Sequence, residues 1–169
     1  MNIKTFLNIL RREGLLDVNN ATDITADDDT ALVNRIKIQK YVYLAKYFNI
    51  NLDFDYTTYN MYLYGPYSPD LAEEYFRLAE EGFFDSSPVE YGYDYNYDYD
   101  INLKKFIEFM RDSNRNNADW LEVASTALEF AKHHTDKDTL LDHVAFVKYR
   151  FDKEYIKGII DDLEKNSLL

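Results

Sequence analysis

The chain has no cysteine, few glycines and prolines, and no long apolar run among its 169 residues. Without cysteine, disulfides, thiolate metal sites and thiol nucleophiles are excluded, and a reducing compartment is expected. The first residues lack the apolar core and the cleavage site of a signal peptide. No segment approaches the roughly eighteen apolar residues of a membrane helix. The sequence therefore predicts a cytoplasmic protein with no membrane contact.

Sequence motifs for catalysis are also missing. There is no G-x-S-x-G elbow, no phosphate-binding loop and no dinucleotide-binding glycine pattern. The adjacent carboxylates Glu73-Glu74 and Asp161-Asp162 fall on predicted helices, where neighbouring side chains point in different directions. We therefore expect no catalytic residue and no cofactor, and a non-enzymatic role is favoured.

Apolar, aromatic and acidic residues are abundant instead. Hydrophobic residues make up 46% of the chain and aromatic residues 17%, enough for a buried core, and the length predicts a single domain over residues 1–169. The net charge is -12, and residues 51–100 hold twelve acids against one base, Arg77. This middle third repels phosphate, so nucleic-acid binding through it is disfavoured.

Residues 30–48 predict a central helix. Its apolar residues fall on most sides of the helix, which is typical of a helix that several neighbours bury. Arg35, Gln39 and Lys46 form its one continuous polar stripe and are candidate binding residues. Four bases lie between residues 31 and 50 without an acid, but they do not share one face, so a core helix is favoured over a nucleic-acid-binding one.

After this helix, the β-forming residues 59–64 predict a strand that ends in a Gly65-Pro66 turn. Ser68 can cap a following helix that runs to Gly82. Tyr64 and Tyr67, at the turn, are further candidate binding residues. Other helices are expected over residues 2–13 and through the C-terminal third, where the candidate capping residues are Asn102, Asn117 and Asp152.

Two polar segments interrupt the helices. Residues 19–29 predict an acidic loop that buries too little apolar surface to become ordered. Residues 91–100 alternate tyrosine with acidic or amide residues, so an extended chain has rings on one face and acids on the other. A strand that pairs with residues 59–64 is favoured. The alternatives are an arm for a basic partner and a calcium loop, which lacks the required glycine and glutamate. In both, Asp94 and Asp98 are candidate binding residues.

The histidines are the best metal candidates. His133, His134 and His143 lie close in sequence to Asp136, Asp138 and Asp142, and imidazole with carboxylate is a ligand set that zinc accepts. No two histidines are four residues apart on one helix, as the metalloprotease pattern requires. Surface or helix-terminal histidines are therefore favoured, and no metal is predicted.

Two stretches resemble a known family. They are RIKIQKYVYLAKYFN and YNMYLYGPYSPDLAEEYFRLAEEG, and the matching residues are Lys37, Gln39, Lys40, Tyr43, Ala45 and the run from Tyr64 to Pro69. The pattern resembles the Panacea domain of SocA-like antitoxins and its YwgA-like relatives. The C-terminal tail is similar to YwgA-like proteins and, more loosely, to a winged-helix segment. The resemblance implies a mostly helical fold with a small sheet and a protein partner, a toxin that is neutralised. An acidic surface suits a basic toxin.

These observations predict a mainly α (α+β) fold, in which a multi-helix domain surrounds one central buried helix, with a small antiparallel β-sheet and winged-helix-like elements. The expected function is a protein-binding module that acts as an antitoxin. One alternative is a winged-helix-like regulator that contacts nucleic acid through Lys148, Arg150, Lys153 and Lys157. A second is a metal-dependent protein that uses the histidines and aspartates of residues 133–143.

Overall fold

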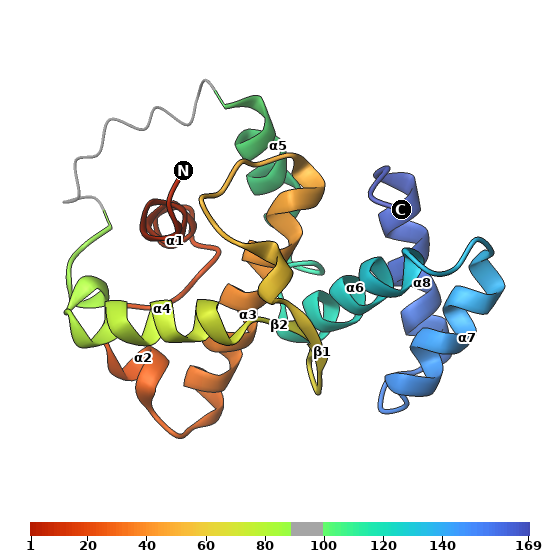
Figure 1. Cartoon of the computed structure of the whole chain (residues 1–169), viewed down its shortest axis with the longest axis horizontal. Coiled ribbons are helices and arrows are strands. Elements are labelled where there is room, and N and C mark those ends of the chain that lie inside the picture. The colour runs from red at the N-terminus through yellow and green to blue at the C-terminus, as the bar shows by residue number, and fades with distance from the viewer. Residues whose placement is uncertain (89–99) are drawn as a thin grey trace.

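The computed structural model describes residues 1–88 and 100–169 (Figure 1). The fold is mainly helical with a small two-stranded antiparallel sheet, which confirms the predicted fold class. The helices and strands in these residues are α1 (Ile3–Arg12), α2 (Thr22–Thr25), α3 (Asp29–Ala45), β1 (Asn60–Tyr62), β2 (Gly65–Tyr67), α4 (Pro69–Glu80), α5 (Ile101–Met110), α6 (Ala118–Ala131), α7 (Lys137–Val147) and α8 (Lys153–Lys165). Short 3₁₀ turns follow α3 and α4 and precede β1.

Helix α3 is the central element, as predicted. It lies in the middle of Figure 1 and packs against α2, α4, α6 and β2. Ile38, Tyr41, Val42 and Leu44 are all fully buried, although they project from different sides of the helix. The Asp28 side chain caps the first turn by accepting a hydrogen bond from the Ala31 N–H at 2.8 Å. A helix with this many neighbours has no single apolar face, because several of its sides pack against other elements.

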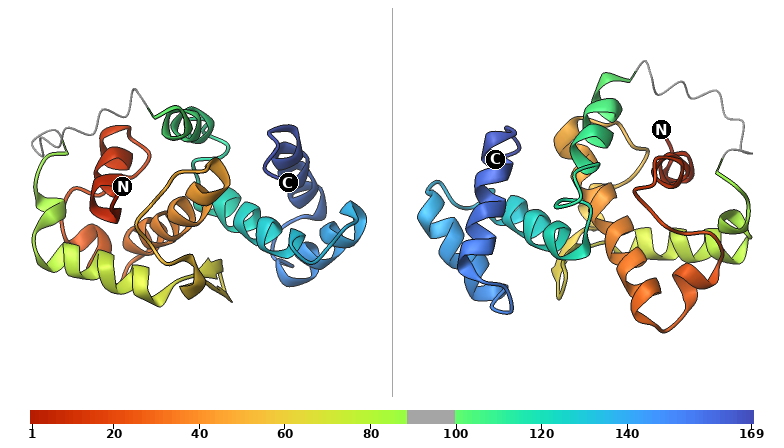
Figure 2. Two further views of the ribbon diagram at one scale, coloured as in Figure 1. Left: turned by 45° about the horizontal axis from the view of Figure 1, so that its top comes forward. Right: turned by 180° about the vertical axis from the view of Figure 1, so that it is seen from behind.

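One buried apolar cluster extends through the described helices, from Phe6 on α1 to Leu163 on α8. Phe106 of α5 is fully buried in it and contacts Phe6, Tyr41 and Phe48, with ring centroids 5.7, 6.1 and 5.3 Å away. Helix α6 extends from α3 to the α7–α8 pair and contacts all three (Figure 2). The C-terminal helices are therefore connected to α3 chiefly through α6.

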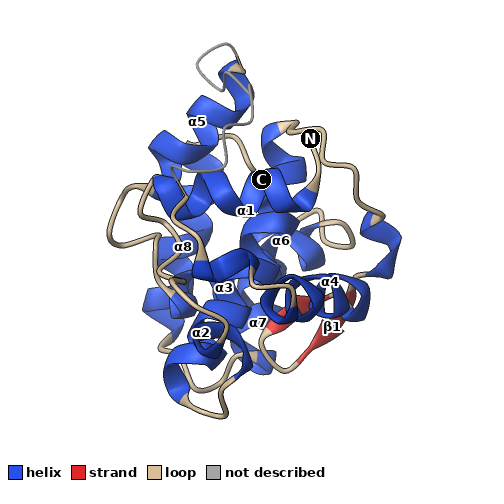
Figure 3. Cartoon of the chain, turned by 90° about the vertical axis from the view of Figure 1, so that its left-hand side faces the viewer, coloured by secondary structure: helices blue, strands red, loops and turns tan. Residues whose placement is uncertain are grey.

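The two strands form a short hairpin beside α4 (Figure 3). Tyr62 pairs with Gly65 and Met61 with Pro66, so the turn is at Leu63-Tyr64. The prediction that Gly65-Pro66 makes the turn is therefore wrong. A proline is tolerated here because in a two-stranded sheet every strand is an edge strand. Among the described residues, β1 pairs with β2 alone, and the predicted partner strand, residues 91–100, lies outside them except for Asp100.

Glycine is required at position 65 for two reasons. Its φ is +85°, a left-handed conformation that other residues adopt at a cost. A side chain would also collide with α6, because a Cβ atom would lie 2.8 Å from Thr126 Oγ1 and 3.2 Å from Ser125 Oγ. The hairpin backbone therefore lies directly against α6.

The prediction of an acidic loop over residues 19–29 is wrong in part, because these residues include α2 and end with the first residue of α3. Ile24 is fully buried and anchors the segment. Asp23 Oδ2 accepts hydrogen bonds from the N–H groups of Asn19, at 2.7 Å, and Asn20, at 3.2 Å. Local side-chain bonds and one apolar anchor thus order a segment that its composition alone predicts to be a loop.

The predicted caps at Ser68 and Asn117 are confirmed. Ser68 Oγ accepts a hydrogen bond from the Leu71 N–H at 3.1 Å, and Asn117 Oδ1 accepts one from the Trp120 N–H at 2.8 Å. The predicted cap at Asn102 is wrong, because α5 begins at Ile101 and Asp100 caps it. Asp152 precedes α8, but its side chain makes no capping hydrogen bond.

Candidate functional site

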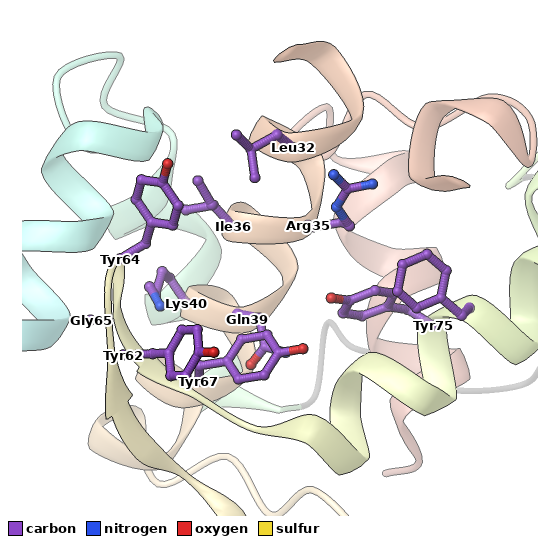
Figure 4. A pocket seen from close by; sticks show the side chains of 11 residues that line it. Leu32, Arg35, Ile36, Gln39, Lys40, Tyr62, Tyr64, Gly65, Tyr67 and Tyr75 are labelled. Carbon is purple, nitrogen blue, oxygen red and sulfur yellow. The ribbon is translucent and has the colours of Figure 1, made fainter. Parts of the chain in front are cut away.

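A cavity of about 240 Å³ opens between α3, the hairpin and α4 (Figure 4). The α3 residues recur at spacings of three and four, so they form one stripe along the helix. Tyrosines and one phenylalanine from the other two elements complete the walls. The lining residues are Leu32, Arg35, Ile36, Gln39 and Lys40 from α3, Tyr62, Tyr64, Gly65 and Tyr67 from the hairpin, and Tyr75 and Phe76 from α4.

Gln39 joins α3 to the start of α4. Its Nε2 donates to Ser68 O at 2.8 Å, and its Oε1 accepts from the Ser68 N–H at 3.0 Å. Gln39 is 2% exposed, so the polar stripe predicted from Arg35, Gln39 and Lys46 is not a continuous exposed stripe. The role of Gln39 in the described structure is to hold the hairpin and α4 against α3.

Arg35 and Lys46, the other two members of that stripe, lie in different environments. Arg35 lines the cavity and donates through Nη1 to Ile24 O at 2.8 Å and to Ala26 O at 3.0 Å. Lys46 lies outside the cavity, with its Nζ 3.7 Å from the ring centroid of Tyr43. Burial lowers the pKa of Lys46 to about 8, with a further lowering by the positive charge of Lys132.

Lys40 is the most unusual residue of the cavity, and the sequence interpretation did not include it as a site residue. It is 1% exposed, and its Nζ donates to Pro66 O at 2.5 Å. Burial lowers the pKa of Lys40 to about 7, Glu122 opposes this shift, and Lys148 adds to it. Lysines are almost never fully buried unless they are paired. Lys40 comes four residues after Ile36 and eight after Leu32, so helical spacing alone could have predicted that it lies on the same face of α3 as these two residues.

Tyr64 and Tyr67, predicted as binding residues, both line the cavity. The Tyr67 ring lies against that of Tyr62, with centroids 5.4 Å apart. Four of the seven candidate binding residues therefore meet at one cavity: Arg35, Gln39, Tyr64 and Tyr67. Lys46 lies elsewhere, and Asp94 and Asp98 are outside the described residues.

A second hollow, of about 170 Å³, lies between the hairpin turn and the connection from α7 to α8. Lys148 crosses it: its Nζ lies 2.9 Å from Glu122 Oε1 and donates to Leu63 O at 2.7 Å. Arg150 also pairs with Glu122, and its guanidinium lies over the rings of Tyr64 and Phe151. The buried carboxylate of Glu122 thus has two cationic partners.

Large apolar side chains are exposed on the hairpin and around the end of α7, the two segments that border this second hollow. Tyr62 and Leu63 of the hairpin are 70% and 72% exposed, and Phe146 and Tyr149 are 80% and 86% exposed. The bond from Lys148 to Leu63 joins the two segments, and Leu63, Val147 and Tyr149 line the same hollow. We call Tyr62, Leu63, Phe146, Val147 and Tyr149 the hairpin–α7 surface.

The four bases proposed for nucleic-acid contact are all paired with acids. Lys148 and Arg150 bind Glu122, Lys153 lies 2.6 Å from Asp142, and Lys157 lies 2.8 Å from Asp161. Each of these bases therefore has an acidic neighbour, which offsets part of the positive charge that attracts phosphate.

The predicted metal candidates are only partly brought together. His134 Nε2 lies 2.8 Å from His143 Nδ1, and the His143 ring stacks on Phe130 with centroids 4.1 Å apart. His133 is not part of this pair. Within residues 1–88 and 100–169, no three histidine or acidic side chains come close enough to hold a metal ion. Protein zinc sites use three or four side chains, so the His134–His143 pair is incomplete as such a site.

Comparisons with known proteins found no family model, no curated protein and no solved structure that matches this chain. In the described part of the chain, none of the helices has both the length and the apolar character that a membrane crossing requires.

Proposed function

We propose that this protein is a non-catalytic protein-binding module, and that its partner is a basic protein of the kind that an antitoxin neutralises. The observation that carries the proposal is the hairpin–α7 surface, where four large apolar side chains are between 70% and 86% exposed. Aromatic side chains are enriched in the buried centres of protein interfaces, and grouped exposed apolar residues mark interaction sites.

Buried contacts fix the position of the hairpin within this surface. The Lys148–Glu122 pair is almost fully buried and holds the hairpin turn through Leu63 O. On the other side, the close approach of Gly65 to α6 leaves the hairpin no space to move inward. Binding to a surface that is already ordered costs less conformational entropy than binding to a mobile loop.

The resemblance to the Panacea domain involves the same part of the molecule. Gln39 binds Ser68, and Lys40 binds Pro66, so the residues that match on α3 contact those that match in the hairpin. They position the hairpin that bears Tyr62 and Leu63. The chain's net charge of -12 favours a basic partner, because opposite charges speed association and align the two proteins.

The test is co-expression with the products of the adjacent genes. We expect one product to be toxic alone, to be neutralised by this chain, and to bind the purified protein in isothermal titration calorimetry. Leu63→Asp introduces a charge on the hairpin–α7 surface and should weaken this binding by about thirtyfold or more.

Ile101→Asp is the matched control. Ile101 is 58% exposed and begins α5, which lies far from the hairpin in Figures 1 and 3. This variant should bind like the wild type. If no adjacent gene product is toxic and bound, or if Leu63→Asp and Ile101→Asp bind equally well, the proposal is wrong.

A further inference from the structure

In the described part of the chain, the cavity of Figure 4 is lined by two basic side chains and no acidic one, in an acidic protein. Two of its lining side chains, Arg35 and Lys40, are cationic, and no carboxylate is among the described residues that line it. In the figure, Lys40 lies on the hairpin side of the cavity and Arg35 on the side of Tyr75. The chain's net charge is -12, so two bases without an acid among the described residues of one cavity run against the charge of the chain as a whole.

Lys40 has unused hydrogen-bonding capacity. An ammonium group has three N–H donors, and in the part of the chain that the structure describes Nζ makes one hydrogen bond, to Pro66 O. Its side chain is 1% exposed, so solvent hardly reaches it, and it is one of the residues that line the cavity. A buried cation with donors left over is costly, and a ligand that accepts from it would offset that cost.

Arg35 also retains free donors. Only Nη1 of its guanidinium is bound, to the carbonyls of Ile24 and Ala26, among the residues whose positions are described. The remaining N–H groups can donate to an anion without releasing α2. The cavity therefore offers charge-assisted donors from two directions, which is typical of carboxylate recognition.

The other walls of the cavity suit a planar ring. Tyr62, Tyr64, Tyr67, Tyr75 and Phe76 supply aromatic surface from the hairpin and α4. Aromatic side chains pack favourably against other rings in offset or edge-on arrangements. The volume of about 240 Å³ is below the roughly 300 Å³ at which drug-sized ligand pockets begin, so a single ring fits better than a fused or extended ligand.

We propose that this cavity binds a monocyclic aromatic carboxylate, with its carboxylate at Lys40 and Arg35 and its ring among the hairpin tyrosines. This site shares Tyr62 with the hairpin–α7 surface, but it does not depend on the docking function proposed above. The lowered pKa of Lys40, about 7, agrees with this assignment, because burial disfavours the charged ammonium and a bound anion would stabilise it.

The experiment is a titration of the full chain with three probes, followed by NMR of the backbone amides. Benzoate has both the ring and the charge, benzamide has the ring without the charge, and acetate has the charge without the ring. We expect saturable 1:1 shifts at Tyr62 and Tyr67 with benzoate, and at least about tenfold weaker binding of the other two probes. Equal binding of benzoate and benzamide, or no saturable binding of benzoate, would overturn the proposal.

Variants locate the binding. Tyr62→Ala removes an exposed ring and should lower benzoate affinity several-fold with the fold intact, and Lys40→Met should abolish the preference for benzoate over benzamide. Tyr149→Ala removes a similarly exposed ring outside the cavity and should leave benzoate affinity unchanged.

If Lys40→Met fails to fold, the benzoate affinity of Tyr62→Ala tests the proposal. An unchanged affinity in that variant would mean adventitious surface binding and would overturn the proposal. Leu63→Asp tests partner binding alone, so the two proposals can fail independently.

Discussion

Lys148 Nζ lies 2.9 Å from Glu122 Oε1, although both side chains are at most 5% exposed. The two residues are 26 positions apart and come from α6 and the end of α7. Because the same Nζ donates to Leu63 O, this one pair holds together α6, the α7–α8 connection and the hairpin. The position of the proposed docking surface therefore depends on a buried ion pair.

Lys148→Met should lower the free energy of unfolding by about 3 kcal/mol, because it removes one of the two ion pairs of the buried Glu122 carboxylate and leaves Leu63 O without its donor. Urea denaturation followed by circular dichroism measures the loss. Lys153→Met is the control, since Lys153 and Asp142 are both exposed, and it should change stability by less than about 0.5 kcal/mol. Equal effects of the two variants would show that the buried pair has no special importance.

Gly65→Ala should destabilise the protein by about 2–4 kcal/mol, because φ is positive and the new Cβ would lie 2.8 Å from Thr126 Oγ1.

Gly158→Ala should have the opposite effect and stabilise the protein. Gly158 lies inside α8, and the methyl group of an alanine there would meet no neighbouring atom within 4 Å, so alanine should stabilise the helix by about 0.5–1 kcal/mol. Thermal denaturation of both variants checks the pair, and a stable Gly65→Ala variant would contradict the close contact with α6.

Lys40 should make stability depend on pH. Its pKa is about 7 in the folded chain, against the ordinary value of 10.5, so between these values the unfolded state binds one more proton and stability rises with pH. The charges that face Lys40 are Glu122 and Lys148. Lys40→Met removes the effect, so the stability of wild type relative to this variant should increase by roughly 1 kcal/mol per pH unit from about pH 7.5 to 9.

Urea denaturation of both proteins across this pH range makes the measurement. In the difference between them, the titration of other groups largely cancels. Lys153→Met again serves as the control, because Lys153 is exposed, and its difference from wild type should stay level over the same range. A level difference for Lys40→Met as well would mean that the folded structure does not lower the pKa of Lys40.

Asp100→Ala should cost about 1 kcal/mol of stability, because Asp100 Oδ1 accepts hydrogen bonds from the N–H groups of Asn102 and Leu103 at the start of α5. Asn102→Ala removes a hydrogen bond to Asn49 O in an exposed position, so its cost should be smaller. Chemical denaturation of both variants ranks them. The reverse order would favour Asn102 as the cap that the sequence pattern predicts.

Local patterns predicted most of the helices. The Ser68 cap followed by Pro69 marks the start of α4, and the Asn117 cap marks the start of α6, because a cap and its helix lie within a few residues of each other. The position of the hairpin turn was predicted wrongly because it, too, was judged from the nearest residues alone. Leu63-Tyr64 has none of the glycine or asparagine that favours a two-residue turn, so the local signal favoured Gly65-Pro66.

The candidate site was predicted in part. The helix stripe and the aromatic turn indicated Arg35, Gln39, Tyr64 and Tyr67, which line one cavity. The burial of Lys40 was not predicted, since a lysine on a helix is usually exposed. The bases at positions 148 to 157 were predicted as a possible patch, and their acidic partners on α6, α7 and α8 became evident only in the folded chain.

For this protein, the order of residues along the chain was enough to indicate a helical fold around α3, because helical periodicity and caps extend over single turns. The environment of each charge depended on packing. Glu122 and Lys148 are ordinary surface residue types in the sequence, and they form a buried pair because α6 and the α7–α8 connection meet behind the hairpin. Coulombic and desolvation energies depend on distance in space, and residues far apart in sequence set that distance.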